Sequence, residues 1–201
     1  MRTYTSLIFM SALALLGSAC SQQAAKTEPA VPVAEYRATA TIKEIMDSLV
    51  DPGSDFIWES VATTVSAKGV EEKAPHTDEE WKEVRRHAIQ LMEATNLLIM
   101  PGRHVAKPGE KADDPKVELG PEQIEALINS DRKSFNDFAH GLYDTIPPVI
   151  DAIDKKDPEA LLNAGDAIDR ACENCHLKYW YPNEAQGQAQ ARPPADGKPT
   201  K

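Results

Sequence analysis

Residues 157–179 read DPEALLNAGDAIDRACENCHLKY, a stretch that joins a helix pattern to a group of metal-binding side chains. The opening Asp-Pro pair is typical of a helix N-cap and first turn. Apolar residues then recur at helical spacing to the end of the stretch, which predicts one long amphipathic helix. Cys172, Cys175 and His176 lie three and four residues apart, so this helix places all three on one face.

Cys172, Cys175 and His176 form the motif Cys-x-x-Cys-His, which is the attachment pattern of c-type haem. The two thiols can bond to the two vinyl groups of a porphyrin, and the adjacent imidazole can bind the iron. A thioredoxin-like site would need a strand before the helix, and none is predicted. A structural zinc site needs four ligands, and the sequence has no second cysteine pair. The motif therefore predicts one covalent haem c, with His176 as the proximal iron ligand.

Three further stretches have helical periodicity. Apolar residues at helical spacing begin at Ile42, and Asp51-Pro52-Gly53 is expected to break this first helix before a short continuation to Val61. A second helix is predicted from Thr77, which has Glu80 at the capping-box position, to Pro101. The third is predicted to begin after Gly120, with Pro121 in its first turn.

Pro147 and Pro148 are expected to kink or interrupt that third helix. Residues 101–120 are charged and rich in Pro and Gly, which predicts a loop. No stretch alternates with a period of two for long enough to predict a sheet. We therefore expect an all-α protein in which residues 38–182 form an antiparallel four-helix bundle, with the haem attached near the C-terminal end of the last helix.

The two ends of the chain differ from this region. Residues 1–19 contain an apolar run of signal-peptide length and end in LLGSAC, which resembles a bacterial lipobox. This predicts a lipoprotein signal peptide and lipidation of Cys20, although an ordinary signal peptide cut near Ala19 would also fit. Residues 20–37 are expected to form a flexible lipid-anchored tether, and residues 183–201 a disordered tail. The chain has 3 cysteines, and the lipid and haem predictions together assign all of them.

The charge balance narrows the classes of partner. Against 22 basic residues the chain has 32 acidic ones, so its net charge is −10 and a nucleic-acid partner is not expected. A basic protein or a neutral small molecule fits this charge better. The sequence contains no recognisable arrangement of catalytic residues, so we do not expect an enzyme.

A haem motif on the last helix of a four-helix bundle resembles the class II c-type cytochromes, the cytochrome c-prime family. The resemblance covers residues 38–182, and its specific motif is Cys172-Glu-Asn-Cys175-His176. It implies that the first helix lies across the distal face of the haem, where Met46 would supply a thioether ligand to the iron. A methionine on an apolar stripe can also serve only as core packing. Other candidate ligands are Met92, Met100 and His140.

Gly165 lies seven residues before Cys172 on the same stripe. A glycine there would allow either a close approach of the macrocycle or a close helix–helix contact. The two interpretations stay open at the level of the sequence.

These observations lead to two main functional hypotheses. The first is a periplasmic mono-haem electron carrier with His/Met ligation, anchored by lipid and exchanging electrons with periplasmic or membrane redox proteins. The second is a protein that binds nitric oxide or carbon monoxide at an open or displaceable sixth site, as the resemblance allows. A subunit docked on a membrane redox complex is a third reading, and a homodimer paired through the first two helices would also follow from the resemblance. Because no aspartate follows Cys20, the outer membrane is the expected location.

Overall fold

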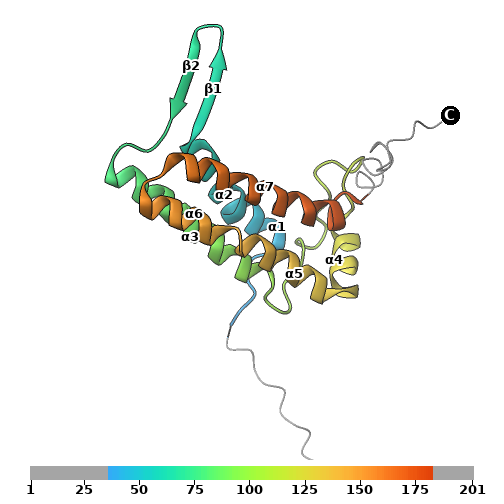
Figure 1. Ribbon diagram of the computed structural model, residues 1–201. Helices are drawn as coiled ribbons and strands as arrows, with labels where there is room; N and C mark the ends of the chain where they lie inside the picture. The colour runs from blue at the N-terminus through green and yellow to red at the C-terminus, as the bar shows by residue number, and fades with distance from the viewer. Residues whose placement is uncertain (1–35, 183–201) are drawn as a thin grey trace, which may run out of the picture. The chain divides into compact units, whose positions relative to one another are not determined.

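Helices account for most of residues 36–182, the part of the chain that the computed structural model describes (Figure 1). The predicted signal peptide, nearly all of the predicted tether and the predicted tail lie outside these residues. The helices are α1 (Ile42–Ile45), a π-helix (Met46–Val50), α2 (Asp51–Ser60), α3 (Asp78–Leu98), α4 (Pro121–Ser130), α5 (Arg132–Tyr143), α6 (Ile146–Lys155) and α7 (Pro158–Tyr179). The prediction of an all-α class is confirmed.

Two predicted helix starts, at Thr77 and Asp157, are confirmed by their caps. The hydroxyl of Thr77 accepts from the backbone N–H of Glu80, and the Glu80 carboxylate accepts from the N–H of Thr77 in return. The carboxylate of Asp157 accepts from the N–H of Ala160 at the start of α7. The Pro147-Pro148 pair stands in the first turn of α6, where a missing N–H costs nothing.

The first helix does not break at Asp51-Pro52-Gly53, so that prediction was wrong. Pro52 has no N–H to donate to the carbonyl four residues before it, and its ring crowds that carbonyl. A wider π turn relieves the conflict: the N–H of Asp51 donates to the carbonyl of Met46, five residues back. Gly53 packs closely on α3, where an added Cβ would lie 3.2 Å from the Cβ of Leu91. Tertiary contact with α3 therefore holds the helix together through the proline.

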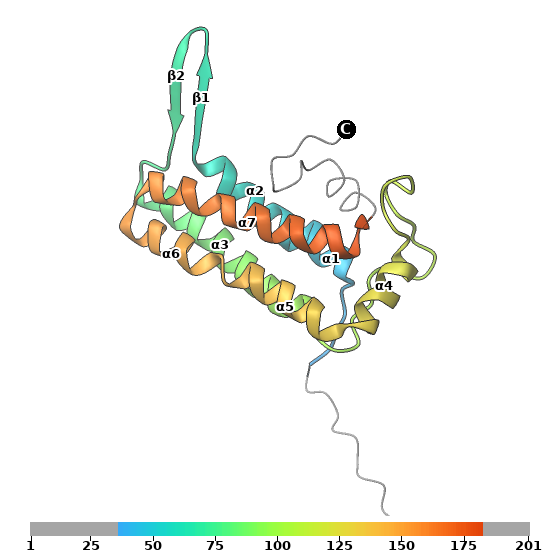
Figure 2. The ribbon, with the colours of Figure 1, turned by 45° about the vertical axis from the view of Figure 1, so that its right-hand side comes forward.

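The third predicted helix is divided into α4, α5 and α6. The interruption near Pro147-Pro148 was predicted, whereas the break at Asp131 was not. Asp131 leaves the helical conformation, with φ −144° and ψ 65°, and its carboxylate caps α5 by accepting from the N–H of Ser134. α4 then runs in a different direction from α5 (Figure 2). The loop predicted at residues 101–120 is confirmed: no helix or strand is assigned there.

Residues 36–182 contain four helical segments that lie side by side in space (Figures 1 and 2). The first segment comprises α1, the π-helix and α2; the second is α3; the third comprises α5 and α6; and the fourth is α7. α3 packs against α2, α5 and α6, and α7 packs against α5 and α6 and also contacts α2. The side chains buried between them are almost entirely apolar, among them Ile42, Ile57, Leu91, Ile146, Leu161 and Ile168. None of the helices described here is long and apolar enough to cross a bilayer.

A β-hairpin was not predicted. β1 (Ala62–Ser66) pairs antiparallel with β2 (Gly69–Lys73), and the hairpin projects away from the helices (Figure 1). Nearly all of its residues are exposed on both faces. A strand that buries neither face has no reason to alternate apolar and polar residues, so the period-two pattern that identifies strands was absent.

Candidate functional site

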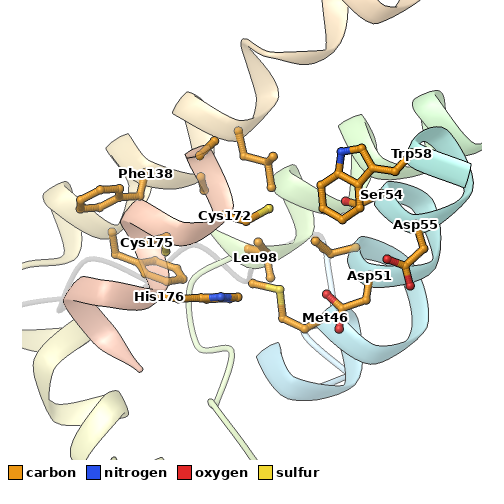
Figure 3. A pocket seen from close by; sticks show the side chains of 15 residues that line it. Met46, Asp51, Ser54, Asp55, Trp58, Leu98, Phe138, Cys172, Cys175 and His176 are labelled. Atoms are coloured by element: carbon orange, nitrogen blue, oxygen red, sulfur yellow. The ribbon is translucent and has the colours of Figure 1, made fainter. Parts of the chain in front are cut away.

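A cavity of about 360 Å³ lies between the first helical segment, α5 and the C-terminal half of α7 (Figure 3). Its lining is largely apolar and includes Val50, Leu98, Phe135, Phe138, Ala139 and Leu142. The side chains that can bind a metal or bond covalently come from two segments: Met46 from the first, and Cys172, Cys175 and His176 from α7. The structure therefore brings together all four haem-site residues named from the sequence.

Cys172 and Cys175 lie within the unbroken helix α7 and direct their thiols into the cavity (Figure 3). Both are free cysteines. Burial, the main cause, raises the pKa of Cys172 to about 11 and that of Cys175 to about 12. At neutral pH both groups are therefore neutral thiols rather than thiolates.

His176 follows directly on the same face of α7. Burial lowers its pKa, and the nearby Asp51 carboxylate opposes this effect only in part. The imidazole is therefore neutral near pH 7, with a nitrogen lone pair free for a metal. Within residues 36–182, no three side chains of His, Cys, Asp or Glu converge as a complete metal site.

The aromatic residues after His176 close the end of α7. The Tyr179 ring is buried edge-on against Phe135 and Phe138, with ring centroids 5.5 and 5.9 Å away. The Trp180 ring centroid lies 5.9 Å from that of the His176 imidazole, so this ring flanks the imidazole. These aromatic rings therefore pack the C-terminal end of α7.

Met46 lies in the first turn of the π-helix and points toward His176 from the other side of the cavity (Figure 3). The other candidate ligands do not line this cavity. Met100 accepts a hydrogen bond at its sulfur from the Arg103 guanidinium, 3.0 Å away. His140 is exposed, and Met92 is half-buried elsewhere against the core. The folded chain thus selects Met46 as the thioether that faces His176.

A second hollow, of about 560 Å³, adjoins the first and shares Met46, Asp51 and His176 with it. Acidic residues predominate in its lining, namely Glu44, Asp47, Asp51, Glu110, Asp113 and Glu118. Lys43 lines it too, and its ammonium lies 2.8 Å from the Asp113 carboxylate. The opening beside His176 is therefore negatively charged, in keeping with the chain's net charge of −10.

Sequence reasoning missed two residues of the cavity wall, Ser54 and Trp58. Ser54 and Trp58 follow Met46 by about two and three helical turns, so they lie on the same face of the first segment. This spacing could have identified them from the sequence. Ser54 is only 2% exposed, and its hydroxyl has no hydrogen-bond partner within the described structure.

Trp58 resolves the two interpretations of Gly165. Its indole N–H donates to the Gly165 carbonyl, 3.1 Å away. A Cβ added to Gly165 would lie 3.0 Å from Cδ1 of Trp58, which is closer than side chains normally approach. The absence of a side chain at Gly165 therefore serves a close contact between α7 and α2.

Comparisons with known proteins leave the family open. No protein-family profile matches the chain, and no curated protein matches it. Among solved structures, it is similar to a nitric oxide complex of a mutant cytochrome c prime from Alcaligenes xylosoxidans, with 18% identity and a TM-score of 0.43. That match covers 71% of this chain and 98% of the other. A similarity at this level does not establish a relationship.

Proposed function

We propose that this protein is a mono-haem c-type cytochrome that carries electrons in the periplasm. The observation that supports the proposal most directly is the lining of one cavity by two thiols, an imidazole and a facing thioether, from Cys172, Cys175, His176 and Met46. Cys172 and Cys175 would hold the haem covalently. His176 and Met46 would be its axial ligands, and the four helical segments would act as a four-helix bundle around it.

The residues fit the cofactor by volume and by chemistry. The cavity of about 360 Å³ and the adjoining hollow of about 560 Å³ are within the roughly 300–1,000 Å³ usual for cofactor pockets. The lining of the 360 Å³ cavity is largely apolar, which suits a flat hydrophobic ring and limits the access of water. Haem supplies one-electron redox chemistry when bound. The chain's contribution is to hold both axial side chains on packed helices, so that a change in iron charge requires little rearrangement.

Double replacement of Cys172 and Cys175 by serine tests this proposal. Wild-type protein made in a host that matures c-type cytochromes should carry one haem per chain by the pyridine haemochrome assay. That haem should resist extraction with acidic acetone. The double variant should lose covalent haem, whereas Cys20→Ala, which changes the third cysteine of the sequence, should keep it. Free extraction of haem from the wild-type protein would contradict the proposal.

A gas-binding role is the second candidate, and Ser54 favours it. Its hydroxyl is buried in the cavity wall without a partner in the described structure, so it could donate to a small polar ligand. Such a ligand would bind iron only if Met46 were absent from the sixth position or displaced from it. Rapid binding of carbon monoxide by the reduced wild-type protein would support this candidate over electron transfer.

We further propose that Cys20 carries lipid and anchors the protein to the outer membrane.

The acidic hollow beside His176 fits a redox partner with a basic docking surface, because opposite charges steer association. The partner could be a periplasmic or a membrane redox protein. No catalytic role is proposed.

A further inference from the structure

The β1–β2 hairpin is an arm that is joined to the helices at its base and is largely exposed along its length. It projects beyond the ends of the helices in both ribbon views (Figures 1 and 2). Val65 is 77% exposed and Val70 is 64% exposed, and the two lie directly opposite each other in the register. A two-stranded hairpin without further contacts is only marginally stable in water. An open strand edge is also a template for another strand.

The two edges of this hairpin differ in chemistry. β1 reads ATTVS: it has no charged residue and no proline, and three of its five residues are β-branched. β2 reads GVEEK and places Glu71, Glu72 and Lys73 on the other edge. Charged residues are a usual protection against edge-to-edge pairing. The edge of β2 is therefore protected, and that of β1 is not.

We propose that β1 pairs antiparallel with β1 of a second copy of this chain, which joins two hairpins into one four-stranded sheet. Full overlap of the strand places Thr64 opposite the partner's Thr64 on a two-fold axis, and Thr63 opposite the partner's Val65. Pairs of β-branched residues are favourable in sheets. The same pairing through β2 would place Glu71 opposite the partner's Glu71, and like charges in that position repel. The charge pattern thus selects β1 and makes it self-complementary.

The backbone of the hairpin is compatible with this register. Ser66 and Gly69 flank a two-residue connection, and Thr64 pairs with Glu71 two positions further along. Hydrogen-bonded and non-hydrogen-bonded pairs alternate along an antiparallel ladder. Thr64 lies two residues before Ser66, so its N–H and C=O point toward β2, as those of Ser66 do. The backbone groups of Thr63 and Val65 then face the open edge. Between copies they would form the hydrogen bonds on either side of a non-hydrogen-bonded Thr64 pair.

A hollow at the base of the hairpin can accommodate the tip of the other copy's hairpin. Antiparallel pairing brings each tip, with Lys68, toward the base of the other hairpin. A hollow of about 260 Å³ lies at that base, lined in part by Val61, Leu162, Glu72 and Glu159. Leu162 is one of the exposed large apolar residues of the described chain. Lys73 also lines the hollow, so two carboxylates and one ammonium give the lining a net negative charge. The hollow therefore offers apolar side chains and a charge that complements the positive charge of Lys68.

Lysine variants at two positions that pair with each other test the proposal. Thr64→Lys places two lysines opposite each other across the proposed two-fold axis. Glu71→Lys introduces the same side chain at the residue of β2 that pairs with Thr64, away from the proposed interface. Sedimentation velocity on the full haem-bearing chain should show a dimer for the wild type. The dissociation constant should rise about tenfold in Thr64→Lys and stay unchanged in Glu71→Lys. A monomeric wild type, or a dimer that Thr64→Lys leaves intact, would overturn the proposal.

Cysteine variants at the same two positions test the register. A non-hydrogen-bonded antiparallel pair has Cα atoms about 4.5 Å apart, which is within the range that a disulfide spans. Thr64→Cys should therefore form a disulfide-linked dimer on mild oxidation, visible on a non-reducing gel, and Glu71→Cys should not. A dimer through the first two helices would give no such link at Thr64. That result, or equal cross-linking of both variants, would refute pairing through β1.

Discussion

Met46 is the side chain that distinguishes the two candidate functions. It faces His176 across the cavity from a π turn, so its thioether is placed to bind an iron held by that histidine (Figure 3). If it does, ferric wild-type protein should be low-spin and show a weak charge-transfer band at long wavelength. Met46→Ala should become high-spin and bind carbon monoxide readily, with a lower reduction potential, because a donor that favours ferrous iron is gone.

Met92→Ala is the matched control for this substitution, because Met92 is a half-buried thioether outside the cavity. It should leave the spectrum unchanged and affect only stability. A Met46→Ala protein that keeps its low-spin spectrum would show that Met46 is a packing residue, whose loss costs about 2–5 kcal/mol of unfolding free energy. A wild-type protein that is already high-spin would support the gas-binding candidate.

Gly165 and Gly141 form a second informative pair of residues, since both lie within helices. A methyl group at Gly165 would meet the Trp58 ring at 3.0 Å, whereas nothing lies within 4 Å of a Cβ built at Gly141. Gly165→Ala should therefore destabilise the protein by about 1–3 kcal/mol, because the tight contact between α7 and α2 must open. Gly141→Ala should stabilise it by about 0.5–1 kcal/mol through helix propensity. Urea unfolding followed by circular dichroism measures both, and a stabilising Gly165→Ala would disprove the contact.

At the scale of elements, the start of α3 depends on the Thr77–Glu80 capping box. Backbone hydrogen bonds from His76 and Thr77 are the largest effects on the Glu80 carboxylate, and they lower its pKa. Because the folded pKa lies below the unfolded one, this stabilisation is present above the unfolded pKa. It is lost as the pH falls through the folded pKa.

Glu80→Ala should therefore lower the Tm at pH 7, and the difference from wild type should shrink below about pH 4. Glu80→Gln keeps a hydrogen-bond acceptor without a titrating charge. The difference in Tm between Glu80→Gln and Glu80→Ala should stay constant over the same pH range. Thermal unfolding across that range measures both, and a constant difference between wild type and Glu80→Ala would rule out the ionised cap.

The proline in the first segment shows how elements depend on one another. Locally, Pro52 predicts a helix end, because it removes a hydrogen bond and crowds a carbonyl. The structure instead shows a π turn followed by α2, which packs along α3 through Gly53 and the buried Ile57. The same π turn carries Met46 into the cavity. The irregularity that Pro52 imposes on the helix therefore helps to place Met46 in the candidate site.

At the scale of the whole molecule, the N-terminal prediction concerns residues outside the described structure. LLGSAC predicts that the mature chain begins at an acylated Cys20 followed by Ser21. Mass spectrometry of the protein from membranes should find a diacylglyceryl cysteine at that position. Cys20→Ala should lose the lipid and move to the soluble fraction with its haem attached. An unmodified N-terminus at another residue would indicate an ordinary signal peptide instead.

The sequence by itself determined the features that depend on near neighbours in the chain. The common face of Cys172, Cys175 and His176, the caps at Thr77 and Asp157 and the all-α class all follow from helical periodicity and local hydrogen bonds. These interactions span three or four residues, so their pattern can be read directly from the sequence.

Only the tertiary structure decided the features that depend on distant contacts. Nothing local distinguished Met46 from Met92, Met100 or His140, because which of them faces His176 depends on how α7 packs against the first segment. The role of Gly165 required a tryptophan 107 residues away, and helix continuity through Pro52 required burial against α3. The hairpin left no periodic pattern because it buries neither face. In each case a contact between distant segments outweighed or replaced the local preference.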